Sequence, residues 1–354
     1  MSAAGNHPAS RPTAAATPFL ATDIGGTHAR VALLRAAPST ALGVETLAYE
    51  VLACADFRGL GELLQRFVQT AATTPVKHCV LACAGQVVGD EVLNDNAAWP
   101  IRLSAVRQAL ALDELAVLND FEALGHAIGG RRIDAARLLC GPDTQTTGPV
   151  LVIGPGTGLG AAACLPVADG YRVLTTEAGQ MDFAPQSLRE RAVLAQLAPD
   201  GGYLPWERVL SGPGLLATYR ALCASDGRSP QLTTPEAVTA AATRRTDVHA
   251  VQAVDVFCAA LGSFSGNLAM TFMAFGGIYL AGGFLHLMFD LLQPSAFAER
   301  FLHARSVRPL LERMPVRVVS HGHLGVLGAA RWYLRQCALR PGAQPMTPAT
   351  GAPA

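Results

Sequence analysis

A glycine-rich stretch near the start of the sequence, DIGGTHAR at residues 23–30, lies between two apolar segments that predict strands. Gly25 and Gly26 let the backbone approach an anion closely, and successive amides in such a turn form a concave anion site without a helix. Asp23 is suited to hold a magnesium ion through water, and the Thr27 hydroxyl is suited to bond a phosphate oxygen. Taken alone, the turn is more simply interpreted as an ordinary hairpin tip.

A second glycine turn, containing Gly156, Thr157 and Gly158, lies in GPVLVIGPGTGLGAAACL and repeats the pattern of strand, glycine turn and strand. Its GTGLGA also satisfies a loose dinucleotide-binding pattern, with Glu177 at a plausible distance, but that pattern needs a helix directly after the turn. The following residues predict a strand instead, and neither turn has the lysine of a P-loop. Two such turns, one in each half of the chain, indicate that both halves bind one polyphosphate, each through its own turn.

An aspartate at the end of an apolar segment, Asp120 in VLNDFEAL, is a candidate general base. A carboxylate in this place projects from the end of a strand, where it can accept the proton of a hydroxyl group during phosphoryl transfer. The alternative is a helix N-cap, because aspartate often precedes a helix such as FEALGHAI. The spacing alone leaves both interpretations open.

The elements that must position these residues follow an α/β pattern. FLATDI, RVALLRA and VETLAYEVLA predict an antiparallel meander, LGELLQRFVQTAA a helix, and HCVLACAG and LAVLND two further strands. The later half restarts this order with its own glycine turn and ends with helices and the strand GGIYLAGG. A repeated unit of this kind predicts two related lobes.

The composition favours small-molecule chemistry in the cytoplasm. Lys plus Arg and Asp plus Glu number 27 each, so no net charge attracts nucleic acid, and no apolar run reaches the roughly 18 residues of a membrane span. The eight cysteines lack metal-ligand spacing and are expected to be small buried residues in a reducing compartment. Residues 1–17 and 341–354 are expected to be a disordered leader and tail.

Six motifs together resemble the bacterial ATP-dependent glucokinases: DIGGTHAR, LNDFEALGHAI, GPGTGLG, EAGQMDFAP, ERVLSGPGL and FGGIYLAGG. The resemblance covers about residues 18–338 and implies the two-domain ribonuclease H-like, actin-like ATPase fold, with the active-site cleft between the lobes. It implies a small domain at 18–130 plus 321–340 and a large domain at 131–320. It also implies phosphorylation of glucose at the 6-hydroxyl with ATP and Mg2+, and it makes a homodimer plausible.

The resemblance also assigns roles to residues. It favours Asp120 as the base, and it places the adenosine pocket at Gly282 and Gly283, which otherwise read as a tight turn. Sugar hydroxyls need acceptors and donors in a fixed arrangement. The expected sugar-binding residues are Asn119, Glu177, Gln180, Glu207 and Asn96. For three of these a simpler interpretation stays open: a solvated carboxylate for Glu177, an ion pair with Arg208 for Glu207, and a turn asparagine for Asn96.

The sequence departs from the family pattern at three positions. Ala178 and Gln180 replace the glycine and histidine of the usual EGGH, and His28 replaces an asparagine in the first turn. Glutamine still donates and accepts hydrogen bonds but does not titrate, so the departures concern the preferred hexose and its affinity. The alternatives are a kinase of another hexose and a non-catalytic sugar sensor; the leader is too short and too rich in Ala and Pro for a DNA-binding module.

Overall fold

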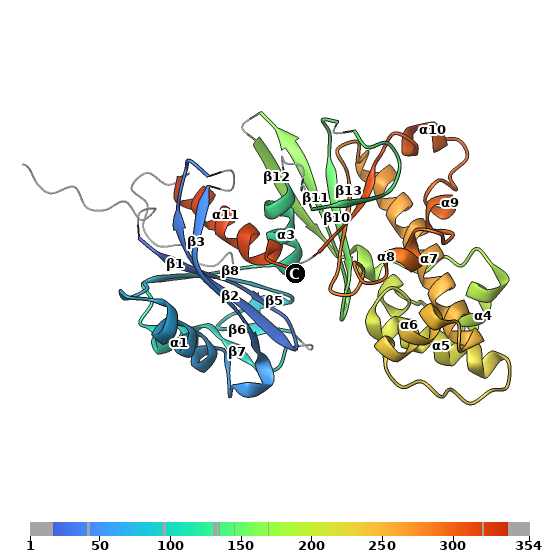
Figure 1. Ribbon diagram of the computed structural model, residues 1–354, viewed down its shortest axis with the longest axis horizontal. Helices are drawn as coiled ribbons and strands as arrows, with labels where there is room; N and C mark the ends of the chain where they lie inside the picture. Colours follow the sequence, from blue (N-terminus) through green and yellow to red (C-terminus); the bar gives the residue numbers. More distant parts are fainter. Residues whose placement is uncertain are drawn as a thin grey trace, which may run out of the picture. The chain divides into compact units, whose positions relative to one another are not determined.

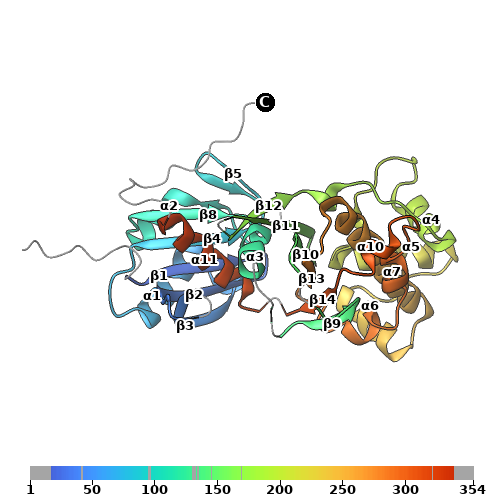
Figure 2. The ribbon, with the colours of Figure 1, turned by 90° about the horizontal axis from the view of Figure 1, so that it is seen from above.

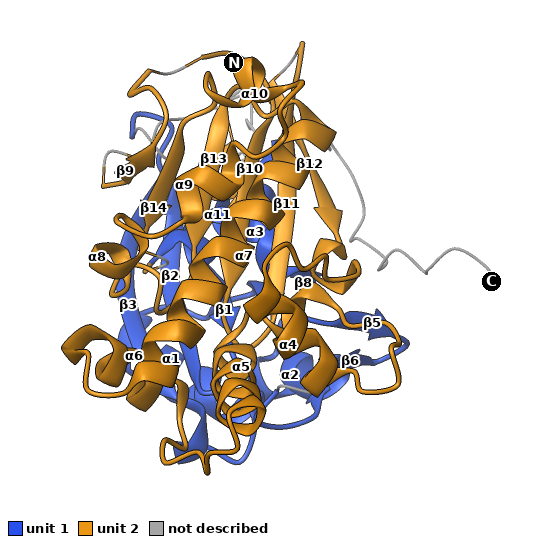
Figure 3. Cartoon of the chain, turned by 90° about the vertical axis from the view of Figure 1, so that its right-hand side faces the viewer, with its two compact units in different colours: residues 1–123, 323–354 blue, residues 124–322 orange. Residues whose placement is uncertain are grey.

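The computed structural model divides into two compact units, one of which is discontinuous in sequence (Figure 3). Unit 1 comprises the chain up to Ala123 together with the residues from His323 onward, and unit 2 runs from Leu124 to Gly322. The predicted leader and tail lie outside the described residues, except for Thr17. The structure describes residues 17–40, 43–94, 97–129, 133, 135–144, 146–168, 170–320 and 322–338.

The described part of unit 1 is built on a five-stranded sheet of order β3-β2-β1-β4-β8 (Figure 1). The first three strands pair antiparallel, which confirms the predicted meander, and β4 and β8 run parallel to β1. Strand β1 is buried along its whole length because both faces of the sheet are covered. The strands are β1 (Phe19–Ile24), β2 (His28–Ala36), β3 (Val44–Ala53), β4 (His78–Cys83) and β8 (Glu114–Leu118).

Two hydrophobic cores lie on the two faces of this sheet, since successive side chains of a strand point to opposite faces. Leu20 packs with Phe67 on one face, while Phe19 and Ala21 pack with Tyr333 on the other. Helix α11 therefore lies across β1 and β4 (Figure 2). The remaining elements of unit 1 are η1 (Cys54–Asp56), α1 (Leu60–Ala71), α2 (Leu103–Leu110), α11 (Leu324–Ala338) and a small sheet of β5 (Gln86–Val88), β6 (Glu91–Leu93) and β7 (Ile101–Arg102).

The sheet of unit 2 has the order β12-β11-β10-β13-β14-β9. Its first five strands repeat the order and the directions of the sheet in unit 1, and β9 is added antiparallel to β14. The repeated strand–turn–strand pattern of the sequence is thereby confirmed. The strands are β9 (Arg137–Cys140), β10 (Val150–Pro155), β11 (Leu159–Val167), β12 (Gly170–Thr176), β13 (Gly277–Ala281) and β14 (Val316–Val319).

Helix α7 is the central helix of unit 2, and α5, α6 and α9 pack around it. Among the described residues it is the one helix long and apolar enough to cross a membrane, although charged and polar residues interrupt any strict apolar run. The most apolar window of α7 is 83% buried inside the protein, so it forms the core. The helices are α4 (Leu188–Leu197), α5 (Gly212–Ser225), α6 (Pro235–Arg244), α7 (Val248–Phe272), α8 (Phe289–Leu292), α9 (Phe297–Phe301), α10 (Arg308–Leu311), η2 (Ala178–Gln180) and η3 (Trp206–Arg208).

Local sequence explains where the helices of unit 2 begin. Ser187 and Glu190 form a reciprocal capping box at α4, and Ser211, Thr234 and Asp247 accept a backbone N–H at the first turns of α5, α6 and α7. Each cap satisfies a donor that the helix itself leaves without a partner. One further helix, α3 (Asp120–Ile128), contains the boundary between the two units.

The eight cysteines are all free thiols. Six are buried, as predicted, and Cys140 and Cys337 are half-buried. The cysteine side chain is small and apolar, which suits it to positions in the hydrophobic cores.

Candidate active site

The first glycine turn connects β1 and β2 and is closed by a hydrogen bond from the Gly25 N–H to the His28 carbonyl at 3.0 Å. Thr27 and His28 are exposed, and His28 Nδ1 lies 3.1 Å from the Thr27 hydroxyl. His28 begins strand β2 and does not adopt positive φ, so its tolerance of that conformation is not what preserves the turn. The Thr27 hydroxyl, the His28 imidazole and the turn amides are the polar groups that this hairpin presents.

Asp23 lies behind the turn and is only 4% exposed. Its Oδ2 lies 3.4 Å from Nη1 of Arg30, the residue directly opposite it in the hairpin register. A Cβ on Gly325, at the start of α11, would lie 2.7 Å from the Asp23 carboxyl carbon, so glycine is needed for this close approach. Arg30 was missed by the sequence reasoning, although the predicted hairpin places it opposite Asp23.

The cap of helix α3 is Asn119, which the alternative interpretation of Asp120 did not anticipate. Asn119 Oδ1 accepts hydrogen bonds from the N–H groups of Phe121 at 2.9 Å and Glu122 at 3.2 Å. Asp120 is the first residue of the helix, and its Oδ1 accepts from the Phe121 N–H at 2.9 Å. Because Asn119 already caps the helix, Asp120 is not needed for that role.

The first turn and Asp120 belong to the same edge of the sheet in unit 1. Parallel strands β1, β4 and β8 end together there, with Ile24 paired to Cys83 and Ala82 paired to Leu118. Burial, followed by the negative charges of Asp120 and Asp23, raises the pKa of the Cys83 thiol to about 12. Both carboxylates therefore act on one thiol at the carboxyl ends of these strands, a common place for ligand sites in α/β sheets.

The second glycine turn connects β10 and β11 in unit 2. The Gly156 N–H donates to the Gly158 carbonyl at 2.8 Å, and the Gly212 N–H, at the start of α5, donates to the Gly156 carbonyl at 2.8 Å. Thr157 at the tip is exposed. The turn is thus held by its own hydrogen bond and by the first residue of a helix, and its tip is open to a ligand.

Three of the predicted sugar-binding residues gather beside this turn. Glu207 Oε2 accepts from the Leu159 N–H at 2.8 Å, and Gln180 Nε2 lies 3.5 Å from Glu207 Oε1. Glu177 precedes the 3-10 turn η2 that carries Gln180, and the Gln180 N–H donates to the Glu177 carbonyl at 2.9 Å. The alternative ion pair between Glu207 and Arg208 is not found among the described residues, since the Glu207 carboxylate points to Leu159 and Gln180.

Backbone pairing holds these segments together. The Phe183 N–H donates to the Leu204 carbonyl at 2.7 Å, and the Trp206 N–H donates to the Met181 carbonyl at 2.9 Å. The Tyr203 hydroxyl also donates to the Gln180 carbonyl. The segment before Glu207 is therefore paired with the segment after Gln180, which explains why two motifs far apart in sequence share one place.

Gly282 and Gly283 follow β13, the strand parallel to β10. A Cβ on Gly282 would lie 2.4 Å from the Pro155 carbonyl oxygen, so this glycine permits close approach to the end of β10, directly before the second turn. A Cβ on Gly283 would meet no atom of the described residues within 4 Å. Gly282 and Gly283, the predicted adenosine-pocket glycines, are thus neighbours of the second glycine turn within unit 2.

Two further positions from the sequence analysis are Asn96 and Ala178. Asn96 lies outside the described residues. Ala178 is 6% exposed, and its extra methyl is accommodated inside unit 2, whereas a Cβ on the following Gly179 would lie 2.2 Å from the Leu159 carbonyl oxygen. Of the two small residues of this motif, Gly179 is therefore the one whose lack of a side chain the packing requires.

Comparison with known proteins places the chain in a family. The sequence model of the family described as Glucokinase matches residues 20–336. A glucokinase-like protein of Xylella fastidiosa is 42% identical over 90% of this chain and 95% of its own, and a glucokinase of Marinobacter nauticus is 38% identical over 87% and 94%.

Among solved structures, a glucokinase from an Antarctic psychrotroph superposes with a TM-score of 0.77 at 28% identity and covers 90% of this chain and 99% of its own. The match extends over both mixed sheets and their flanking helices, the arrangement of the ribonuclease H-like, actin-like ATPase fold. With a family match over most of its length and relatives above one third identity, this chain belongs to the glucokinase family.

Proposed function

We propose that the protein is an ATP-dependent hexose kinase that transfers the γ-phosphoryl group of ATP to the 6-hydroxyl of glucose. The observation that carries this proposal is the grouping of chemical roles within each unit. In unit 1 a candidate base and a phosphate-type turn share one sheet edge, and in unit 2 a second such turn adjoins three polar side chains suited to a sugar. Phosphoryl transfer asks a protein for these parts and little covalent chemistry.

In the proposed reaction Asp120 accepts the proton of the sugar 6-hydroxyl. The oxygen forms a bond to the γ-phosphorus while the bond from that phosphorus to the bridging β,γ oxygen breaks, and ADP leaves. Asn119 holds the start of α3 through Oδ1 and keeps its amide N–H2 available to donate to a hydroxyl group. Asp120 and Asn119 thus act as base and positioning neighbour.

The nucleotide phosphates would be bound by backbone amides of the two turns and by the hydroxyls of Thr27 and Thr157, with Gly282 and Gly283 beside the adenosine. Magnesium, when bound, supplies positive charge that neutralises the phosphates. The burial of Asp23 and its contact with Arg30 fit a metal held through water, because direct coordination would compete with that ion pair.

The sugar would be bound by Glu177, Gln180 and Glu207 of unit 2. Glu177 and Gln180 are exposed and Glu207 is half-buried, so all three are accessible to hydroxyl groups. Carboxylates accept from hydroxyls, and the Gln180 amide both donates and accepts. The proposal requires these residues and Asp120 to act on the same bound hexose.

The test is a coupled ADP-release assay with ATP and magnesium against glucose, mannose, fructose and glucosamine, using the wild type and Asp120→Asn. We expect turnover with glucose, and a loss of at least about 100-fold in kcat for Asp120→Asn with hexose binding retained, because general-base catalysis contributes about that much or more. Near-normal turnover of the variant would exclude Asp120 as the base. Hexose binding without ADP release by the wild type would identify a sugar sensor instead.

A further inference from the structure

The Glu207 carboxylate contacts both the second glycine turn and Gln180, another of the proposed sugar-binding residues. Its Oε2 accepts from the N–H of Leu159, the first residue after the turn, at 2.8 Å. Within the part of the chain that the structure describes, its Oε1 has only the 3.5 Å contact with Gln180 Nε2, a weak hydrogen bond by length. Oε2 therefore binds the turn, and Oε1 is the oxygen that can accept a hydrogen bond from a sugar hydroxyl.

The Glu207 carboxylate also packs closely against the turn at Gly158. A Cβ on Gly158 would lie 2.5 Å from Glu207 Oε2, so the carboxylate fills the space that a side chain at 158 would occupy. The carboxylate and the turn thus fix each other's positions, and a small movement of one must displace the other.

Two further hydrogen bonds hold the segment that carries Glu207, and one of them joins it to the turn through the backbone. The Ser211 hydroxyl donates to the Glu207 carbonyl at 2.8 Å, and the Gly212 N–H donates to the Gly156 carbonyl at 2.8 Å. Residues 207–212 are therefore attached to both ends of the turn, at Gly156 and at Leu159. The turn cannot adopt its position independently of Glu207.

We propose that Glu207, beyond its proposed sugar contact, is a positioning residue for the second glycine turn: its Oε2 holds the Leu159 N–H, so the turn keeps the shape that binds nucleotide phosphates. This inference rests on the proposed kinase function.

The test measures binding of the magnesium complex of AMPPNP by calorimetry in the absence of sugar. The variants are Glu207→Ala, Glu207→Gln and, as the matched control, Glu177→Ala, which removes a carboxylate of the sugar cluster without a turn contact. We expect Glu207→Ala to weaken nucleotide binding about tenfold, the effect of losing one hydrogen bond to a charged group. Glu207→Gln keeps an acceptor oxygen for Leu159 and should bind nucleotide within about threefold of wild type, as should Glu177→Ala.

A second variant tests the same contact in case Glu207→Ala does not fold. Gly158→Ala should displace the carboxylate and weaken nucleotide binding similarly, and adding it to Glu207→Ala should cost little more, since both remove one contact. Wild-type nucleotide affinity in Glu207→Ala, or full additivity of the two changes, would overturn the positioning role of Glu207. A wild-type protein that binds no nucleotide would overturn the kinase function itself, and this inference with it.

Discussion

Position 180 carries glutamine where the glucokinase motif carries histidine, and the structure shows what that side chain contacts. Its amide is exposed and lies 3.5 Å from Glu207 Oε1. Glutamine has no proton to lose near neutral pH, whereas histidine titrates with an ordinary pKa of about 6.5.

We therefore expect residue 180 to add little pH dependence to the wild-type KM for glucose between about pH 6 and pH 8. Gln180→His should lower that KM and add a pH dependence centred near pH 6.5, since the protonated and neutral imidazole present different donors to a hydroxyl. Steady-state kinetics at several pH values measure both effects. An unchanged KM and pH profile in Gln180→His would show that this side chain does not contact the sugar.

Gly325 offers a second prediction at the residue scale. A methyl group there would lie 2.7 Å from the carboxyl carbon of Asp23, inside van der Waals contact. Gly325→Ala should destabilise the protein by about 1–3 kcal/mol, as overpacking does, and raise the KM for ATP by shifting Asp23. Urea unfolding and kinetics measure the two effects. Gly283→Ala is the control, because open space surrounds its Cβ position, and it should leave the free energy of unfolding nearly unchanged.

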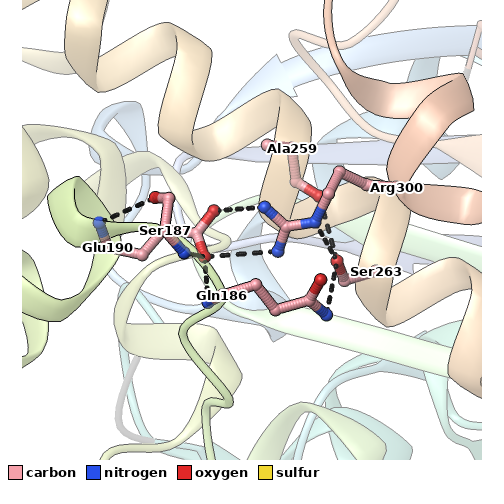
Figure 4. A network of polar contacts seen from close by, with 6 residues as sticks. All are labelled: Gln186, Ser187, Glu190, Ala259, Ser263 and Arg300. Carbon is pink, nitrogen blue, oxygen red and sulfur yellow. Dashed lines mark hydrogen bonds and ion pairs between the residues drawn. The ribbon is translucent and has the colours of Figure 1, made fainter. Parts of the chain in front are cut away.

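At the scale of the elements, one buried network joins three helices of unit 2 (Figure 4). The Arg300 guanidinium on α9 donates to both carboxylate oxygens of Glu190 on α4, at 2.6 and 3.2 Å, and its Nε donates to Ser263 on α7 at 2.9 Å. The N–H groups of Gln186 and Ser187 also donate to Glu190. Glu190 is 1% exposed, so these partners compensate the cost of burying its charge.

Burial by itself would raise the pKa of Glu190, but the hydrogen bonds from Arg300, Gln186 and Ser187 and the charge of Arg300 hold it below its ordinary value of 4.5. A carboxyl with a lowered folded-state pKa contributes stability that is present above its unfolded-state pKa and is lost as the pH falls through the folded-state pKa. The network thus stabilises unit 2 near neutral pH and weakens in acid.

Arg300→Met should therefore cost about 3–5 kcal/mol of unfolding free energy at neutral pH, since it leaves a buried carboxylate without its partner. The difference from wild type should shrink below about pH 4.5, where Glu190 becomes protonated in the unfolded chain. Urea unfolding at about pH 7 and pH 4 measures both values. Arg308→Met, which breaks an exposed pair with Glu312, is the control and should cost no more than about 1 kcal/mol. A difference that stays constant with pH would exclude this role for Glu190.

The same scale shows what sequence could and could not supply. The strands and glycine turns were predictable because they are local: an apolar run, then Gly25-Gly26 or Gly156-Thr157-Gly158, identifies each hairpin without tertiary information. The S-x-x-E pattern at Ser187 was equally visible and was missed. Neither the partner of Glu190, at position 300, nor that of Glu207, at Leu159, could be predicted, because such contacts depend on tertiary packing rather than on sequence spacing.

The cap of α3 illustrates a finer limit. Asn119 and Asp120 are adjacent and both are good N-cap residues, so the sequence could not decide between them. The structure gives the cap to Asn119, through two backbone N–H groups. A shift of one residue in the helix start thus decides which side chain is left for chemistry, and helix ends are the least certain part of any prediction.

At the scale of the whole molecule, the two candidate nucleotide turns lie one in each unit. Ligands that bind only the folded protein stabilise it, by about 2.7 kcal/mol at a concentration 100 times Kd. Magnesium-ATP should therefore raise the Tm by a few degrees, and NAD at the same concentration should not. Thermal unfolding with each ligand makes the comparison. A larger shift with NAD than with magnesium-ATP would favour the dinucleotide interpretation of GTGLGA.

Unit 1 takes its last helix from the far end of the described chain, because α11 packs on β1 and Gly325 lies close to Asp23. During synthesis on the ribosome, the strands of unit 1 emerge first and must wait until all of unit 2 has been translated before one face of their sheet is covered. Since domains generally fold as units during synthesis, the inserted lobe has the opportunity to fold first. A nascent chain halted before α11 would expose Phe19 and Ala21 to chaperones, and it would lack the helix start that packs closely beside Asp23.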